Sequence, residues 1–190
     1  MREMAPTASI MPPPKVDFFG NDIKVPGFEQ PSTMFANRLL NPFVEMAALE
    51  GKQSDVIKML IKYNSTKKLD DKNDPPVWFQ EPSRKVSVRY PNNPASIRED
   101  MNEKEYHLYA KLSGLLAAKE IDKINWNFDK PSSDDIMLLE KIFTKTREAS
   151  RKMITAARQA KALNYLDEYD RIIREVEDEI KKSVPAKGAK

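Results

Sequence analysis

Residues 133–163, SDDIMLLEKIFTKTREASRKMITAARQAKAL, are the stretch that decides the fold. Ser133 is a favourable N-cap residue, and Asp134 and Asp135 follow in the first turn, where the helix dipole favours negative charge. Apolar or small residues then recur at steps of three and four, which predicts one long amphipathic helix. Its predicted core-facing stripe consists of Ile136, Leu139, Phe143, Thr146, Ala149, Met153, Ala157 and Ala160. Such a helix needs neighbouring segments that bury the stripe.

Composition excludes several classes of protein. The chain has 190 residues, enough for one domain with a core, and its 32% of charged residues leave a formal net charge of only +3. The absence of cysteine excludes disulfides and cysteine nucleophiles, and the single histidine, His107, argues against a histidine triad or metal centre. No apolar run is long enough to span a bilayer, and the N-terminus lacks a secretory signal. We find no catalytic constellation and expect a soluble protein that is not an enzyme and has no metal or cofactor.

The distribution of proline divides the chain into two halves. Twelve of the fourteen prolines precede residue 96, and proline removes backbone donors and fixes φ, so the first half cannot form a regular bundle. We expect an extended N-terminal arm at 1–32, short helices and a proline-rich docking segment at 33–95, a helical bundle at 96–183 and a disordered tail at 184–190. The predicted fold class is mainly α, a small helical bundle or hairpin preceded by an extended proline-rich arm with short helices and one short strand.

The first half contains few regular elements. Ser32 can cap a short helix that ends near Leu40, and Ser54 can cap a second helix over DVIKMLIKY. Apolar residues alternate with polar ones at Val86, Val88 and Tyr90, which predicts one short strand. No hairpin partner is evident nearby. We therefore expect this strand to add to a sheet edge in another chain.

The second half has the signals of helices. Asn102 and Glu105 have the spacing of a capping box, and Gly114 inside the following helix indicates close packing against another helix. After Asn164, apolar residues recur at alternating steps of three and four, as in a coiled-coil seam. This seam consists of Leu166, Tyr169, Ile173, Val176 and Ile180.

The charge pattern of the long helix allows two interpretations. Residues 141–161 contain seven lysines or arginines and one acid, which could neutralise phosphates. Residues 167–179 contain seven acids and two arginines, so a charge-matched helical hairpin is the favoured interpretation. If the helix does contact nucleic acid, the candidate residues are Lys145, Arg147, Arg151, Lys152 and Arg158.

Five aromatic residues lie in segments with little predicted helix, beside glycine, proline or polar residues. Exposed aromatic side chains often mark partner sites and contribute strongly to binding. The candidate partner-binding residues are Phe18, Phe19, Phe43, Trp78 and Phe79.

Four segments occur in a particular order along the chain: KVDFFGNDI (15–23), NRLLNPF (37–43), VSVRY leading into MNEKEYHLYAKLSG (86–114), and KIFTKTREASRKM (141–153). Together they resemble the C-terminal region of large virion proteins of tailed bacteriophages, which include polyvalent, internal or ejected, and tape-measure-like proteins. That family typically begins the helix after the strand with Leu-Thr-Pro-Glu-Glu-Tyr. Here Asn102-Glu103 replaces Thr-Pro, so the cap is kept and the proline is not.

The resemblance implies a non-catalytic virion module with no catalytic residues. We therefore expect a structural or interaction protein of a bacteriophage particle, made in the host cytoplasm and located in the virion, where its arm docks on other virion subunits. Two alternatives stay open at this point. One is an RNA-associated assembly subunit, such as an organellar ribosome accessory protein, and the other is a DNA-binding packaging or scaffold factor.

Overall fold

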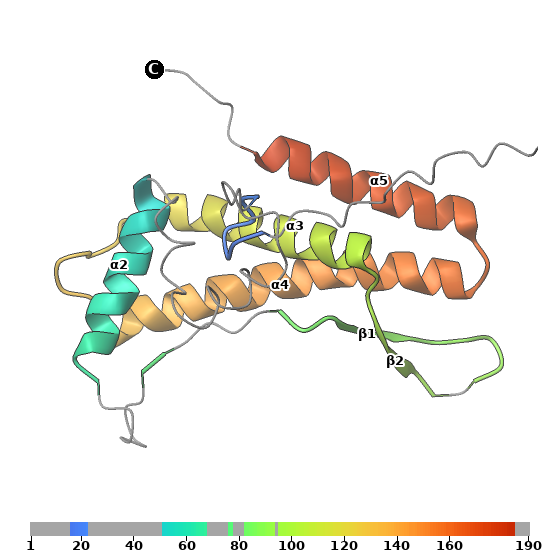
Figure 1. The fold of residues 1–190 in the computed structure, drawn as a ribbon, viewed down its shortest axis with the longest axis horizontal. Coiled ribbons are helices and arrows are strands. Elements are labelled where there is room, and N and C mark those ends of the chain that lie inside the picture. The colour runs from blue at the N-terminus through green and yellow to red at the C-terminus, as the bar shows by residue number, and fades with distance from the viewer. Residues whose placement is uncertain (1–15, 23–50, 68–75, 78–81, 94, 185–190) are drawn as a thin grey trace, which may run out of the picture.

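The computed structural model describes residues 16–22, 51–67, 76–77, 82–93 and 95–184. Within these residues the protein is mainly helical, with four helices that contain 65% of them, which confirms the predicted mainly-α class. The helices are α2 (Gly51–Ser65), α3 (Glu103–Asp122), α4 (Ser133–Ala162) and α5 (Leu166–Ser183), and the strands are β1 (Lys85–Val88) and β2 (Ile97–Asp100) (Figure 1). None of the described helices combines the length and apolar character needed to cross a membrane.

The long helix predicted over 133–163 is present as α4, and the other elements pack along it. Its 30 residues correspond to about 45 Å of helix. α4 runs beside α3, and the chain then turns back through Asn164 (φ 62°), a left-handed conformation that asparagine tolerates, into α5 (Figure 1). Two buried apolar clusters lie along α4. One cluster lies next to the hairpin formed by β1 and β2, and we call it the hairpin-side cluster. It includes Val86, Val88, Tyr109, Leu112, Ile154, Ala157, Ile173 and Val176. The α2-side cluster includes Phe19, Val56, Met59, Ile121, Trp126, Leu139 and Phe143.

Capping boxes begin both α3 and α4. The predicted box at α3 is confirmed, because the Asn102 side chain accepts from the Glu105 N–H and the Glu105 side chain accepts from the Asn102 N–H, each at 2.9 Å. At α4 the N-cap is Ser132, one residue before the predicted Ser133. Asp135 stands three residues after Ser132 and closes the reciprocal pair, which a cap at Ser133 would not allow.

The buried face of α4 differs from the predicted stripe in its second half. Ala149 is exposed and Met153 is half-buried, whereas Ser150 and Ile154 are buried. From Thr146, the predicted series (Ala149, Met153) and the observed series (Ser150, Ile154) both continue at helical spacing. Both contain only small or apolar residues. The difference follows from tertiary contacts, because Ile154 enters the hairpin-side cluster between α3, α5 and β1.

Two other predicted helices are present with small differences. α2 begins at Gly51, three residues before the predicted cap at Ser54. In α5 the last three predicted seam residues are buried, namely Ile173, Val176 and Ile180. Tyr169 is partly buried against them, and Leu166 is exposed.

The predicted strand is not unpaired. β1 pairs antiparallel with β2, with Val86 opposite Glu99 and Val88 opposite Ile97. Val86 and Val88 are both buried against the helices. β2 has the sequence IRED, whose charges gave no strand signal. The expectation that this strand has no partner in its own chain is therefore wrong, which removes the reason for expecting it to pair with another chain. The β1–β2 hairpin crosses the predicted boundary between residues 95 and 96.

Several expectations fall outside the described residues. They are the extended arm at 1–15 and 23–32, the short helix from Ser32 to Leu40, and the tail at 185–190.

Prediction for the hairpin: a fragment that keeps β1 should be more stable than one that starts at the predicted boundary. Residues 82–184 retain Val86 and Val88 in the core, whereas residues 96–184 lose both. Burying one valine contributes about 1.5–3 kcal/mol, so the shorter fragment should melt at a clearly lower temperature in circular dichroism. Both fragments lack α2 and Phe19, so the comparison reports on residues 82–95, which contain β1 and the Ser83 carbonyl that accepts from Arg151. Equal melting temperatures would show that β1 adds nothing to the core.

Candidate functional site

Residues 16–22, VDFFGND, form a compact unit that we call the N-terminal turn. Val16 and Asp22 form an isolated antiparallel bridge. One carboxylate oxygen of Asp17 accepts from the backbone N–H groups of Phe19 (2.8 Å) and Asn21 (2.9 Å). Gly20 has φ of 78°, in the left-handed region that glycine adopts without strain. The segment predicted as part of an extended arm is therefore a turn held by its own hydrogen bonds.

The N-terminal turn lies directly on α3 at Gly114. A Cβ atom on Gly114 would lie 2.1 Å from the backbone nitrogen of Gly20 and 2.4 Å from the carbonyl carbon of Phe19. A Cβ atom on Gly20 would lie 2.3 Å from the carbonyl oxygen of Lys111. No side chain fits between the two backbones. The close packing expected at Gly114 is present, but its partner is this turn and not another helix.

Side chains extend the contact to three helices. The Phe19 side chain is fully buried, with its ring centroid 6.0 Å from that of Phe143 in α4. Asp22 forms an ion pair with Lys111 of α3 at 2.6 Å. Asn21 donates to the side chain of Gln53 in α2 at 3.0 Å. The three contacts fix the turn on the body of the protein.

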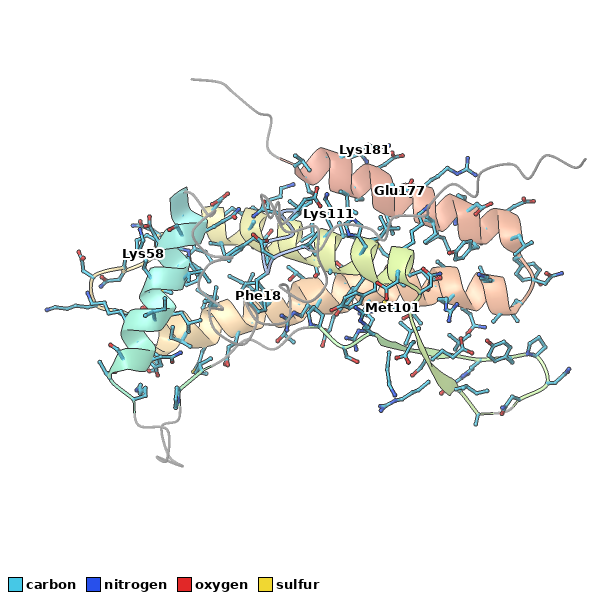
Figure 2. All side chains as sticks on the ribbon, in the orientation of Figure 1. Phe18, Lys58, Met101, Lys111, Glu177 and Lys181 are labelled. Atoms are coloured by element: carbon cyan, nitrogen blue, oxygen red, sulfur yellow. The ribbon has the colours of Figure 1, made fainter. Side chains whose placement is uncertain are left out.

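The predicted partner-binding residues differ in their burial. Phe19 is buried within its own chain, because its ring belongs to the α2-side cluster. The neighbouring Phe18, labelled in Figure 2, is 41% exposed. Phe43, Trp78 and Phe79 lie outside the described residues.

A second polar site joins four elements around Arg158 of α4. The Arg158 Nη2 atom lies 2.9 Å from a carboxylate oxygen of Glu99 in β2 and donates to the backbone oxygen of Asp100 at 3.1 Å. The Arg158 Nε atom lies 3.6 Å from Glu105 in α3, which is fully buried. The other oxygen of Glu105 accepts from the hydroxyl of Tyr169 in α5 at 3.2 Å. We call this group the Arg158 network.

The Arg158 network has a structural role. Burial, together with the charge and hydrogen bond of Glu105, raises the pKa of Tyr169. At the rim, a hydrogen bond to Glu99 raises the pKa of Tyr90. In this arrangement each tyrosine hydroxyl donates to a carboxylate. The described residues contain no cluster of acidic and histidine side chains suited to a metal ion.

Two further arginines of α4 are engaged with the body of the protein. Arg151 donates to the backbone oxygen of Ser83 at 3.2 Å and to the hydroxyl of Tyr109 at 3.1 Å. The guanidinium of Arg147 lies 5.7 Å from the centre of the Phe143 ring, and burial lowers its pKa. Neither arrangement leaves the guanidinium fully presented to solvent. Of the five predicted nucleic-acid contacts, only Lys145 and Lys152 are exposed.

The structure also differs from the predicted helical hairpin, in which basic residues of the long helix would face the acids of the last helix. Arg151 and Arg158 contact β2, α3 and the segment before β1. Acids of α5 pair mostly within their own helix, in Arg171–Glu168, Arg171–Glu175, Lys181–Asp178 and Lys182–Glu179. The interface between α4 and α5 is instead apolar, with Ile154 and Ala157 in the same cluster as Ile173 and Val176.

Sequence reasoning missed both sites. The Arg158 network depends on Glu99 of a strand that carried no strand signal. For the N-terminal turn a signal was present, since Asp17 stands three residues before Gly20, a spacing typical of a side-chain-capped turn. That signal indicates a turn but not the surface on which it packs.

Prediction for the Arg158 network: Arg158→Met should destabilise the protein by roughly 3 kcal/mol, because it leaves the buried Glu105 carboxylate without its cation. Arg158→Met combined with Glu105→Gln should recover part of this loss, because the double variant buries no unpaired charge. Urea denaturation of the two single variants and the double variant gives the coupling energy. Additive losses would contradict the pairing of Arg158 with Glu105.

Comparisons with known proteins complete the description of the chain. No family model, no curated protein and no solved structure matches it.

Proposed function

We propose that this chain is a non-catalytic structural or interaction protein of a tailed-bacteriophage particle. In this proposal it is made in the host cytoplasm and resides in the virion. There it docks on other virion subunits through its N-terminal segments. The described residues supply a rigid helical body to which the first part of the chain is attached at a defined point, the N-terminal turn.

The observation that carries the proposal is the contact at Gly114. Three of the four segments that resemble the phage proteins meet there: Phe19 and Gly20 come from the first, Gly114 from the third and Phe143 from the fourth. Segments far apart in the sequence thus build one structural unit. Residues 37–43, the remaining segment, lie outside the described residues. This arrangement supports a reading of the four segments as parts of one module.

Phe18 is the residue of the N-terminal turn that we propose as a contact to a partner. Its side chain is 41% exposed, while its neighbour Phe19 is fixed in the core. The backbone around it is held by Asp17 and Gly20, so the ring is presented from a rigid turn and loses little entropy on binding. Aromatic rings in such positions contribute strongly to interfaces.

The nucleic-acid alternatives have less support. Arg158 is neutralised by Glu99 and Glu105, and Arg151 holds the segment before β1. Lys145 and Lys152 are exposed on α4 but share their helix face with Glu148. Two lysines beside an acid provide little net positive charge for phosphate binding. Such binding would also weaken steeply with salt.

Prediction for the particle: purified particles of the phage whose genome carries this gene should contain the chain, as detected with an antibody against it. Phe18→Ala should reduce its incorporation about tenfold, the effect of losing roughly 1.4 kcal/mol at an interface. The melting temperature of the free protein should stay unchanged, because Phe18 is not in the core.

Ile61→Ala is the matched control, since Ile61 is 44% exposed on α2 and lies outside the turn. It should leave incorporation unchanged. Absence of the wild-type chain from purified particles would contradict the proposed function. Equal incorporation of Phe18→Ala and wild type would contradict the role of Phe18 alone.

A further inference from the structure

The N-terminal turn has the properties of a folded peptide ligand. Its shape is maintained by contacts within residues 16–22, namely the two hydrogen bonds to Asp17 and the bridge between Val16 and Asp22. A further backbone hydrogen bond joins the Gly20 N–H to the Asp17 carbonyl oxygen at 3.1 Å. The turn therefore carries much of its bound conformation in its own sequence.

Among the described residues, the surface that receives the turn is built from parts of the chain that are distant in sequence. Its floor is the backbone of α3 at Lys111 and Gly114, which lies against the backbone of Phe19 and Gly20. Phe143 of α4 borders the space that the Phe19 ring fills, and the Lys111 ammonium pairs with Asp22. We call this surface the Gly114 groove. It recognises an aromatic residue, then a glycine with positive φ, then a carboxylate.

The covalent link between the turn and the groove is long. Residues 23–50 separate the turn from α2, and 28 residues can span about 90 Å when extended. Closing a loop of this length costs entropy, and this cost grows only slowly with loop length. The contacts between turn and groove are the same whether the two belong to one chain or to two.

We infer that the Gly114 groove is a peptide-binding site that the N-terminal turn of a second copy of this chain can fill. Exchange of the turn would link copies without any new interface, because each contact is already present within one chain. At low concentration the chain's own turn fills the groove, since covalent attachment raises its effective concentration there. At the high local concentration of an assembly, the turn of a second copy competes with the chain's own turn for the groove. This inference does not depend on the proposed function.

Two complementary variants test the inference in the full-length chain. Gly114→Ala blocks the groove, because its Cβ would lie 2.1 Å from the Gly20 nitrogen, and leaves the turn intact. Phe19→Asp with Gly20→Val disables the turn and leaves the groove intact. Each variant alone should be monomeric in size-exclusion chromatography with light scattering. An equimolar mixture at up to about 1 mM should contain a heterodimer with one donated turn. A mixture that stays monomeric would overturn the inference.

A peptide measurement keeps the test decisive if the variant with the disabled turn folds poorly. The peptide KVDFFGNDI, residues 15–23, should raise the melting temperature of that variant or restore its helical circular dichroism. The same peptide with alanine in place of Phe19 is the control and should do neither. The Gly114→Ala chain, whose groove is blocked, should not respond to either peptide. Failure of KVDFFGNDI to stabilise the variant would also overturn the inference.

Discussion

The contact between two glycine backbones, Gly20 of the N-terminal turn and Gly114 of α3, is the constraint on which much of this structure depends. Any side chain at Gly114 would overlap the turn, since even a Cβ would lie 2.1 Å from its backbone. The close approach lets the Phe19 ring reach the α2-side cluster and brings Asp22 to Lys111. The N-terminal turn is thereby fixed to a helical body by few contacts, each of which depends on the others. If the two backbones were held apart, both the burial of the Phe19 ring and the ion pair between Asp22 and Lys111 would be lost.

α4 provides the second constraint, because it is shared by both apolar clusters. Its first half packs with α2 and the turn, and its second half packs with α3, α5 and the hairpin. Arg158 then fixes how the second half is arranged, since the buried carboxylate of Glu105 is costly unless its cation and its hydrogen-bond donors are in place. Through Glu99, Glu105 and Tyr169, this one network sets β2, α3 and α5 relative to α4.

The sequence was informative where local spacing decides the structure. The capping box of Asn102 and Glu105 and the existence of α4 follow from residues three or four positions apart. The face of α4 was predicted only in part, because Ala149 and Ser150 are equally compatible with a helical stripe. β2 could not be predicted from IRED, since its pairing depends on Val86 and on the ion pair from Glu99 to Arg158. The burial of Phe19 was also beyond sequence reasoning, because its cause is a glycine on another element. At the candidate sites, the spacing of Asp17 and Gly20 is typical of a turn, but residues 16–22 were predicted as part of an extended arm. No local signal identifies the groove that receives the turn.

These features support a protein whose body is rigid and whose N-terminal segment is attached by recognition and not only by covalent continuity. Amide hydrogen exchange of the free chain at low concentration tests this account most directly. The N–H groups of Phe19, Gly20 and Asn21 are hydrogen-bonded within the turn, and the turn lies on α3. The account predicts slow exchange at these three amides, comparable to that of Leu112 and Leu115 in the facing helix. Exchange at the rate of an unstructured peptide at these amides, with α3 still protected, would show that the turn is not docked and would contradict the account.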